Sequence, residues 1–369
     1  MGYEKDGRVV LTLDAGGTNF RFSAARGGRP VGEPVALPSN GDDLPRCLET
    51  LREGFRRVKD AAPAAPVAIS FAFPGPADYP RGIIGDLGNL PGFKGGVAVG
   101  PMLEDVFGVP VYINNDGDLF AFGEAIAGLL PWVNGLLEQA KSPKRFRNLF
   151  GATFGTGFGG GIVQDGRLWI GDNAAGGEIW LLRSKHEPRW NIEESVSIRA
   201  VRRVYAERAG ISFDAAPEPR DIDAIGRGER PGDAAAAREA FRKMGEAAGD
   251  ALATAITLVD GLVVVGGGLT GAAHFFLPAI VAEMNAAYDT PSGSFSRMEV
   301  KAFNLEDPAE RAAFVAGEAV EVPVPGSGRK VAYDPLKRIG VGLSRLGTSE
   351  AVAVGAYAFA LAELDRKSR

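Results

Sequence analysis

The chain has 369 residues, a length that suits about two domains. Its formal net charge is −5, which argues against a nucleic-acid-binding surface, because such a surface needs clustered Lys and Arg. Cys47 is the single cysteine, so neither a disulfide within the chain nor a cysteine-rich zinc site can form. No stretch of about 18 apolar residues predicts a membrane span, and charges interrupt the first residues where a signal peptide would be apolar. A cytoplasmic protein with no membrane partner is therefore expected.

The first half of the chain opens with two predicted strands joined by a glycine-rich turn. The apolar run at 8–13 is followed by DAGGTN (14–19) and by a second strand-like run, FRFSAA (20–25), an order typical of a hairpin. Apolar residues at helical spacing predict a helix over 43–60. The next predicted elements are two strands and a helix, at 67–73, 109–115 and 118–130.

The second half repeats this opening. Strands predicted at 148–154 and 159–170 again enclose a glycine-rich turn, which indicates a duplication on the scale of a domain. Two helices, a buried strand and a closing helix rich in small residues follow, at 193–209, 233–256, 261–265 and 351–364. The stretches 131–147 and 288–337 fit the repeat poorly and are interpreted as insertions, for which surface decoration is the favoured role.

Three glycine-rich turns are candidate phosphate-binding loops, at 14–19, 155–161 and 266–271. The last satisfies G-x-G-x-x-G between a predicted strand and a helix, so a nucleotide-dependent oxidoreductase is one interpretation. The middle turn satisfies the same pattern, but a strand follows it where a dinucleotide fold has a helix. Successive backbone N–H groups in such turns can hold phosphate, and Thr18 and Thr156 would add hydroxyl donors. The alternative for each turn alone is a plain hairpin turn.

The order of these motifs resembles that of the sugar kinases of the ROK (repressor, open reading frame, kinase) family, in the actin/Hsp70/hexokinase superfamily. LDAGGTNFRFSAA resembles the first phosphate motif of the family, FAFPGPADYPRGIIGDLGNLPGF its P-G-P and substrate segments, and INNDGDLFAFGEA its catalytic stretch. FGTGFGGGIV, VVVGGGLTGA and VAVGAYAFAL are similar to its second phosphate motif, adenosine loop and closing helix. The resemblance implies an α/β fold of two related actin-like (ribonuclease H-like) domains with an intervening cleft. One domain would comprise residues 1–117 with 350–369, and the other residues 118–349.

The resemblance also implies a reaction, the ATP-dependent phosphorylation of a glucose-like or N-acylated hexose at its primary hydroxyl with Mg²⁺ as the metal. Asp116 would be the general base; from its position between a strand and a helix alone, it is equally suited to be an N-cap. Asp14 would hold Mg²⁺ through water, form an Asx turn, or do both, and Asp118 is expected to be a cap or solvated. The residues that match sugar ligands of the family are Asn89, Asn115, Asp116, Glu178 and Glu193. Those that match ATP ligands are Asp14, Gly16, Gly17, Thr18, Asn19, Gly155, Thr156, Gly157, Gly266, Gly267 and Gly268.

The chain departs from the family pattern at 178–194. Leu181 stands where the family carries a histidine, and HEPRWNIEES stands where it carries zinc-binding cysteines, so no zinc is expected. The candidates to order this loop through buried apolar area are Trp180, Leu181, Leu182 and Trp190.

Several alternatives stay open. The residues do not name the hexose, do not decide between ATP and polyphosphate as donor, and do not decide between Glu193 and Glu194 as the sugar ligand. A non-catalytic sugar-sensing regulator is a second function, but regulators of the family begin with a helix-turn-helix, and the first strand near residue 8 leaves no room for one. An oxidoreductase would leave the N-terminal glycine turn unexplained. The resemblance further implies a homodimer.

Overall fold

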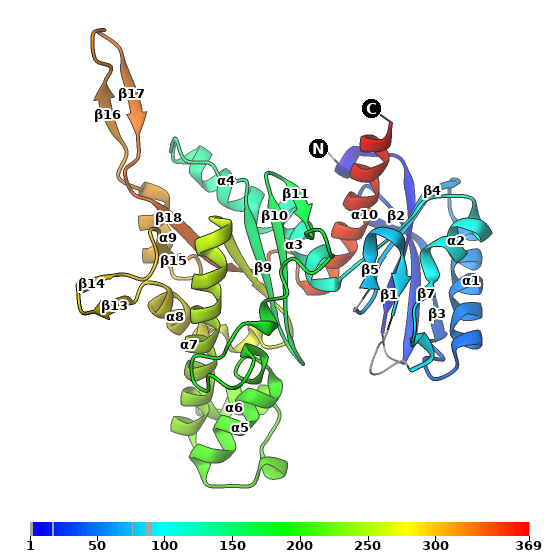
Figure 1. Ribbon diagram of the computed structural model, residues 1–369, viewed down its shortest axis with the longest axis horizontal. Helices are drawn as coiled ribbons and strands as arrows, with labels where there is room; N and C mark the ends of the chain where they lie inside the picture. Colours follow the sequence, from blue (N-terminus) through cyan, green and yellow to red (C-terminus); the bar gives the residue numbers. More distant parts are fainter. Residues whose placement is uncertain (1–2, 17, 76, 86–90, 369) are drawn as a thin grey trace. The chain divides into compact units, whose positions relative to one another are not determined.

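The computed structural model describes residues 3–16, 18–75, 77–85 and 91–368. The chain divides into two compact units, both of mixed α/β structure (Figure 1). Unit 1 comprises Met1–Ala127, Leu168–Gly176 and Ser349–Arg369, and unit 2 comprises Gly128–Arg167 and Gly177–Thr348. Gly17 and Asn89, two of the predicted ligands, lie outside the described residues.

Unit 1 is built on a five-stranded sheet with the strand order β3-β2-β1-β4-β8. The first three strands are antiparallel neighbours, so the hairpin predicted around residues 14–19 is confirmed. β4 runs parallel to β1 on one side and to β8 on the other. The strands are β1 (Val9–Ala15), β2 (Asn19–Arg26), β3 (Arg29–Pro38), β4 (Pro66–Ala72) and β8 (Val111–Asn114), and a smaller sheet holds β5 (Ala77–Asp78), β6 (Ile83–Ile84) and β7 (Val97–Ala98).

The core of unit 1 forms where the amphipathic helix α1 (Leu44–Ala61) packs on this sheet. Asp43 starts the helix as its N-cap, accepting a hydrogen bond from the backbone N–H of Arg46. Phe55 on the buried face is edge-on to Phe22 of β2, with ring centroids 5.0 Å apart. The other helices of the unit are η1 (Tyr3–Lys5), η2 (Tyr79–Arg81), η3 (Pro91–Phe93), α2 (Val99–Phe107), α3 (Asp116–Ile126) and α10 (Thr348–Lys367).

Unit 2 repeats the strand order of unit 1. Its six-stranded sheet has the order β11-β10-β9-β12-β18-β15, with β10 and β9 antiparallel and with β12 parallel to β9 and β18. The duplication that the two glycine-turn hairpins indicate in the sequence is therefore present in the topology. The strands are β9 (Leu149–Phe154), β10 (Phe158–Gln164), β12 (Leu262–Gly266), β15 (Lys301–Asn304), β18 (Arg338–Leu343) and β11 (Arg167–Trp169), of which only Arg167 falls in unit 2.

The helices of unit 2 centre on the long helix α7, which packs closely on α8. Gly245 and Gly249 on α7 allow this approach, because a Cβ at either position would lie against backbone carbonyls of α8. The helices are α4 (Leu129–Gln139), η4 (Ile179–Leu181), η5 (Ile192–Glu194), α5 (Ile198–Ala209), η6 (Phe213–Ala215), α6 (Pro219–Gly226), α7 (Ala234–Val259), η7 (Thr270–Ala272), α8 (Ala273–Met284) and α9 (Pro308–Ala316).

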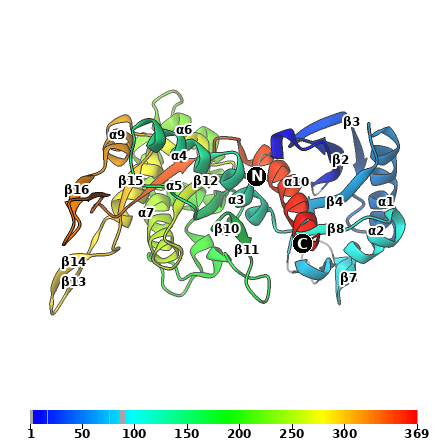
Figure 2. The ribbon, with the colours of Figure 1, turned by 90° about the horizontal axis from the view of Figure 1, so that it is seen from above.

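The stretch 288–337 contains elements of two kinds. β15 and α9 belong to the body of unit 2, since β15 joins the six-stranded sheet. Two hairpins stand outside that sheet at the edge of the unit (Figure 2). They are β13 (Ala287–Thr290) with β14 (Gly293–Ser296), and β16 (Val320–Pro323) with β17 (Lys330–Tyr333). In the stretch 131–147, residues 131–139 continue α4 and the remainder is irregular.

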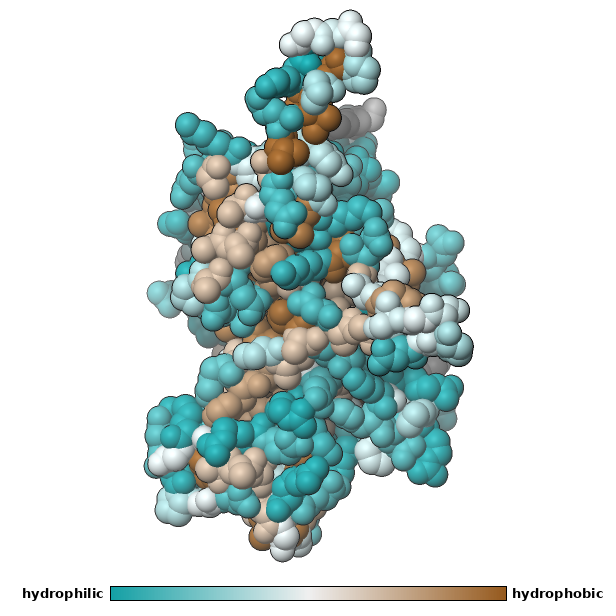
Figure 3. All heavy atoms as spheres, turned by 90° about the vertical axis from the view of Figure 1, so that its left-hand side faces the viewer, coloured by the Kyte–Doolittle hydropathy of each residue, from teal (hydrophilic) through white to brown (hydrophobic). Residues whose placement is uncertain are grey.

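The β16–β17 hairpin has an apolar and a polar face. The register pairs Val320 with Tyr333 and Val322 with Val331, so these four side chains share one face, and each is at least 37% exposed. Hydrophobic side chains are visible over this hairpin in Figure 3. Near its root, Arg338 and Asp334 form a buried ion pair at 2.6 Å, with 0% and 5% of their side chains exposed.

One segment differs from the expectation that no stretch could span a membrane. By length and composition alone, the 24 residues Asp116–Gln139 would suffice to do so. The structure divides them into α3 and α4, and 56% of the apolar window is buried, as is common for core helices.

The small residues of the closing helix α10 serve backbone-to-backbone packing against α3. A Cβ at Gly123 of α3 would overlap the carbonyl oxygen of Ala351, and a Cβ at Gly355 of α10 would overlap that of Leu119. Because the neighbouring groups are backbone atoms, they cannot move aside by a change of rotamer.

We therefore expect Gly355→Ala to destabilise the protein, although alanine is favoured over glycine in a helix by about 1 kcal/mol. The matched control is Gly135→Ala in α4, where a new Cβ has nothing within 4 Å. The control should gain about 0.5–1 kcal/mol. Thermal unfolding followed by circular dichroism measures both, and a Gly355→Ala protein that melts at or above the wild-type temperature would contradict the packing.

Candidate active site

The first candidate group lies where β8 passes into α3. Asn115 is the N-cap of α3 and accepts the backbone N–H of Gly117 at 2.8 Å, so Asp116 is the first residue of the helix. The interpretation of Asp116 as the N-cap is therefore wrong by one residue. Asp116 Oδ1 accepts the same N–H at 2.9 Å, and the side chain is exposed. The helix N-terminus also favours a negative charge at this position.

The neighbouring aspartate differs from its prediction. Asp118 was expected to be a cap or solvated, but it is only 4% exposed. It faces inward because it lies two residues after Asp116 in the same helix, on a different side of the first turn. The exposed carboxylate of this turn is thus Asp116.

The first glycine turn connects β1 to β2. Asp14 is exposed near the end of β1 and lies opposite Arg21 in the register. A Cβ at Gly16 would lie 2.8 Å from the carbonyl oxygen of Asn19, so glycine allows the turn to close tightly. Thr18 accepts the backbone N–H of Ser39 through its carbonyl oxygen at 2.9 Å, which leaves its hydroxyl outside that bond.

The second glycine turn, Gly155–Gly157, connects β9 to β10 as a tight hairpin. The N–H of Gly155 donates to the carbonyl oxygen of Gly157 at 3.0 Å. A Cβ at Gly155 would meet nothing within 4 Å, whereas one at Gly157 would lie 2.5 Å from Glu193 Oε2. The turn is therefore open on one side and in contact with a predicted sugar ligand on the other.

The third glycine turn follows β12 and lies beside the second. β9 and β12 are parallel neighbours, with Gly266 opposite Thr153, so both turns leave the sheet at the carboxyl ends of adjacent strands. Gly267 has φ +92°, and a Cβ there would overlap the backbone of Phe154 at the end of β9. A Cβ at Gly268, by contrast, would point into open space, with nothing within 4 Å. The structure thus brings together the two ATP-binding candidates of unit 2.

Glu178 and Glu193 come from two short 3₁₀ turns of unit 2. Glu178 precedes η4, and its Oε2 accepts a hydrogen bond from the indole N–H of Trp180. Glu193 lies in η5, and its Oε2 accepts the backbone N–H of Phe158 at 3.0 Å. Both side chains are partly exposed.

The choice between Glu193 and Glu194 has a structural counterpart in their ion pairs. Both carboxylates contact Arg199, at 2.9 and 2.7 Å, and Glu194 also contacts Arg203. Hydrogen bonding to Arg199 is the main reason that the pKa of Glu194 is lowered, and it outweighs the raising effect of burial. Two guanidinium groups thus contact Glu194, whereas Glu193 shares one guanidinium and lies next to the glycine turn.

The loop between η4 and η5 is closed by backbone hydrogen bonds. Ile192 donates to Leu182, and Ser184 donates to Trp190 at 3.0 Å. Leu181 and Trp190 were expected to order the loop by burial, and this is wrong, because they are 60% and 42% exposed. Among the described residues, no group of three or more His, Cys, Asp or Glu side chains is placed to hold a metal ion.

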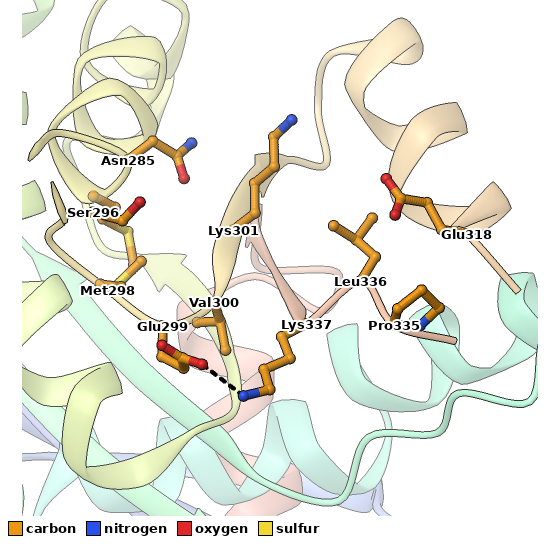
Figure 4. A pocket seen from close by; sticks show the side chains of 11 residues that line it. Asn285, Ser296, Met298, Glu299, Val300, Lys301, Glu318, Pro335, Leu336 and Lys337 are labelled. Carbon is orange, nitrogen blue, oxygen red and sulfur yellow. Dashed lines mark hydrogen bonds and ion pairs between the residues drawn. The ribbon is translucent and has the colours of Figure 1, made fainter. Parts of the chain in front are cut away.

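A separate hollow of about 540 Å³ lies in unit 2 next to the roots of both hairpins (Figure 4). Two of its lining residues, Lys337 and Glu299, form an ion pair at 2.7 Å at the lower end of the hollow in Figure 4. Its size is in the range of small-molecule sites, but its lining includes none of the predicted sugar or nucleotide ligands that the structure describes.

The repeated strand order, with a glycine turn after the first strand of each sheet, defines the class of two-domain actin-like α/β proteins. The family model of the ROK family matches residues 10–309, and the chain belongs to this family. The resemblance and the fold class inferred from the sequence are therefore confirmed.

Solved structures of similar proteins include a glucokinase. The chain is 57% identical to a glucokinase from Parabacteroides distasonis ATCC 8503, with a TM-score of 0.91 over 98% of this chain and 99% of that one. A ROK hexokinase from Thermus thermophilus shares the fold at 21% identity, with a TM-score of 0.67 over 97% and 99% of the two chains.

Curated relatives match over a shorter region. An N-acetyl-D-glucosamine kinase from Vibrio cholerae serotype O1 is 32% identical over 173 residues, which are 46% of this chain and 51% of that protein. The chain thus spans about half the length of the curated relatives that it matches.

The lowered pKa of Glu194 yields a pH prediction. Its ionised form stabilises the folded state, so its contribution is fully present above the usual glutamate pKa of about 4.3 and is lost as the pH falls through the lower folded value. We expect Glu194→Gln to lower the melting temperature at pH 7. The difference in melting temperature between wild type and variant should be smaller at pH 4 than at pH 7. The control is Glu321→Gln, which removes an exposed pair with Lys330 at 3.5 Å and should have almost no effect. A difference that is as large at pH 4 as at pH 7 would contradict the ion-pair explanation.

Proposed function

We propose that the chain is an ATP-dependent kinase that phosphorylates the primary hydroxyl of a glucose-like or N-acylated hexose. The observation that carries the proposal is the exposed carboxylate of Asp116, fixed by Gly117 in the first turn of α3. The names of the relatives support the substrate class, since one is a glucokinase and another an N-acetyl-D-glucosamine kinase.

Asp116 would act as the general base. The hydroxyl oxygen of the hexose attacks the γ-phosphorus of ATP while its proton passes to the carboxylate of Asp116, and the bond from phosphorus to the leaving oxygen of ADP breaks. The hydrogen bond from Gly117 holds Oδ1, and a carboxylate has further lone pairs to accept the hydroxyl proton. Asn115 uses its oxygen in the helix cap, so its amide N–H groups remain as donors to a sugar hydroxyl.

The glycine turns would bind ATP through their backbone N–H groups. Gly155, Thr156 and Gly157 lie in the β9–β10 hairpin, and Gly266, Gly267 and Gly268 follow the adjacent strand β12. One ATP molecule is long enough to contact both turns, with a phosphate at one turn and the adenosine at the other, because the two turns leave neighbouring strands. In unit 1, Asp14, Gly16, Thr18 and Asn19 are the proposed phosphate-binding residues.

Asp14 fits a magnesium ion, because it is an exposed carboxylate and Mg²⁺ is commonly held by one or two carboxylates together with waters and substrate phosphates. When bound, Mg²⁺ neutralises charge on the phosphate oxygens. Zinc has no place in the proposal, since Cys47 is the single cysteine and a cysteine-rich zinc site needs several thiolates.

We further propose that the enzyme is a cytoplasmic homodimer with neither nucleic-acid nor membrane partners. The family resemblance supports the dimer, and the net charge of −5 supports the absence of nucleic acid. Sedimentation equilibrium tests the oligomeric state.

Asp116→Asn should lower kcat by about 10²–10⁴-fold, because the amide cannot accept the hydroxyl proton. Hexose affinity should stay close to wild type, since the amide still offers an oxygen and an N–H to hydroxyls. The matched control is Asp105→Asn on α2, an exposed carboxylate outside the proposed site, which should keep full activity. An Asp116→Asn enzyme with more than about a tenth of the wild-type rate would refute the assignment.

Gly268→Val should raise the KM for ATP more than the KM for the hexose, because the valine side chain would fill the open space beside the third turn, where ATP is proposed to bind. Gly268 suits this test better than Gly267, whose positive φ and contact with Phe154 make any substitution disruptive to the fold. Steady-state kinetics measures both constants, and a melting temperature near wild type confirms an intact fold. Equal effects on both KM values would argue that the turn does not bind ATP.

A further inference from the structure

The second glycine turn is connected to the segment 193–199 by three hydrogen bonds. The backbone N–H of Ile198 donates to the carbonyl oxygen of Gly155 at 2.8 Å. Arg199 Nη1 donates to the carbonyl oxygen of Thr156 at 3.2 Å. The backbone N–H of Phe158 donates to Glu193 Oε2 at 3.0 Å. The connections therefore involve two residues of the turn, Gly155 and Thr156, and Phe158, which follows the turn at the start of β10.

Arg199 joins the two sides of this connection. The same guanidinium that bonds to Thr156 donates through Nη2 to Glu193 Oε1 at 2.9 Å. Glu194 holds the guanidinium from a third direction, accepting from Nε at 3.0 Å and from Nη2 at 2.7 Å. The planar fork of arginine can serve these partners at the same time, which a lysine ammonium cannot do in the same geometry.

Glu193 keeps the capacity to bind more than these partners. An ionised carboxylate has about four lone-pair positions, and Arg199 and Phe158 each use one oxygen. Any donor that fixes Glu193 in this orientation also fixes the N–H of Phe158. It affects Gly157 as well, because Glu193 Oε2 lies 2.5 Å from where a Cβ of that glycine would be.

We propose that Arg199 is a positioning residue that couples the two substrates, so that a hexose bound at Glu193 orders the turn Gly155–Phe158 and strengthens nucleotide binding. This inference rests on the proposed function, since it takes Glu193 as a sugar ligand and the turn as a phosphate loop. Coupling between two ligands is reciprocal, so the nucleotide strengthens hexose binding by the same factor.

Arg203 provides a matched control one helical turn further along α5. Arg203 has the same side chain as Arg199 and also donates hydrogen bonds to Glu194, to the backbone carbonyl oxygen and to the carboxylate of that residue. Its guanidinium lies over the ring of Trp190 at 4.7 Å. Within the described part of the chain, the hydrogen bonds of this guanidinium are to Glu194, so it does not connect Glu193 to the glycine turn.

The experiment measures the dissociation constant of a non-hydrolysable ATP analogue with Mg²⁺ by calorimetry, with and without a saturating hexose. The hexose is whichever of glucose and N-acetylglucosamine the wild type phosphorylates. The ratio of the two constants should be about 5–150 for the wild type, the usual range of such coupling. It should fall below about 2 for Arg199→Met and stay near the wild-type value for Arg203→Met. If Arg199→Met does not fold, as judged by its melting curve, Arg199→Gln serves the same test.

The outcomes separate the inference from the function on which it rests. A wild-type chain that binds neither the analogue nor either hexose would refute the proposed function. A wild type that binds both with a ratio of one, an Arg199 variant that retains the wild-type ratio, or equal loss in Arg199→Met and Arg203→Met would each overturn the coupling role.

Discussion

The close approach of two backbones at the end of β9 is the constraint on which the proposed nucleotide-binding turns of unit 2 depend. Gly267 adopts φ +92° directly against Phe154, and Leu269 donates its N–H to the carbonyl oxygen of Phe154 at 3.1 Å. Because the third turn is fixed to the last residue of β9, it stays beside the second turn, which begins at the next residue. A side chain at 267 would separate them, so the glycine there has a structural reason that is independent of any ligand.

The proposed sugar ligands of unit 2 depend on a different interaction, the backbone closure of the loop 182–192. Hydrogen bonds between Leu182 and Ile192 and between Ser184 and Trp190 hold the loop ends together, and the hydroxyls of Ser184 and Ser195 are 2.7 Å apart. Glu178 and Glu193 flank this closure on either side. Neutral hydrogen bonds that are partly shielded from water thus close this loop, and they leave both carboxylates to other partners.

The helices, strands and hairpins that the sequence predicted depend on local patterns. The two hairpins with glycine turns, the helix at 43–60 and the strand at 261–265 follow from residues that are adjacent in the chain, and the structure contains all four. The order of the motifs was sufficient to identify the family, although each motif alone was weak. The helix predicted at 118–130 begins two residues earlier, at Asp116, and ends at Ile126, because Asn115 rather than Asp116 caps it.

Other features depend on contacts between distant residues and left no local signal. β3 contains two prolines before its last residue and is largely exposed, so it lacks the alternation of a half-buried strand. β15 lies between two hairpins that contain glycine and proline, so the sequence around this strand resembles an insertion. Arg199 is one of many arginines in the sequence, and only the fold brings Thr156, Glu193 and Glu194 to its guanidinium.

Hexose kinase activity is tested most directly by a coupled assay of ADP release by the purified chain with Mg²⁺ and ATP, offering glucose, N-acetylglucosamine and N-acetylmannosamine singly. At least one hexose should accelerate ADP release well above the rate without sugar, and the sugar product should carry its phosphate on the primary hydroxyl. No acceleration by any hexose, or a phosphate on a ring hydroxyl, would contradict the proposed activity.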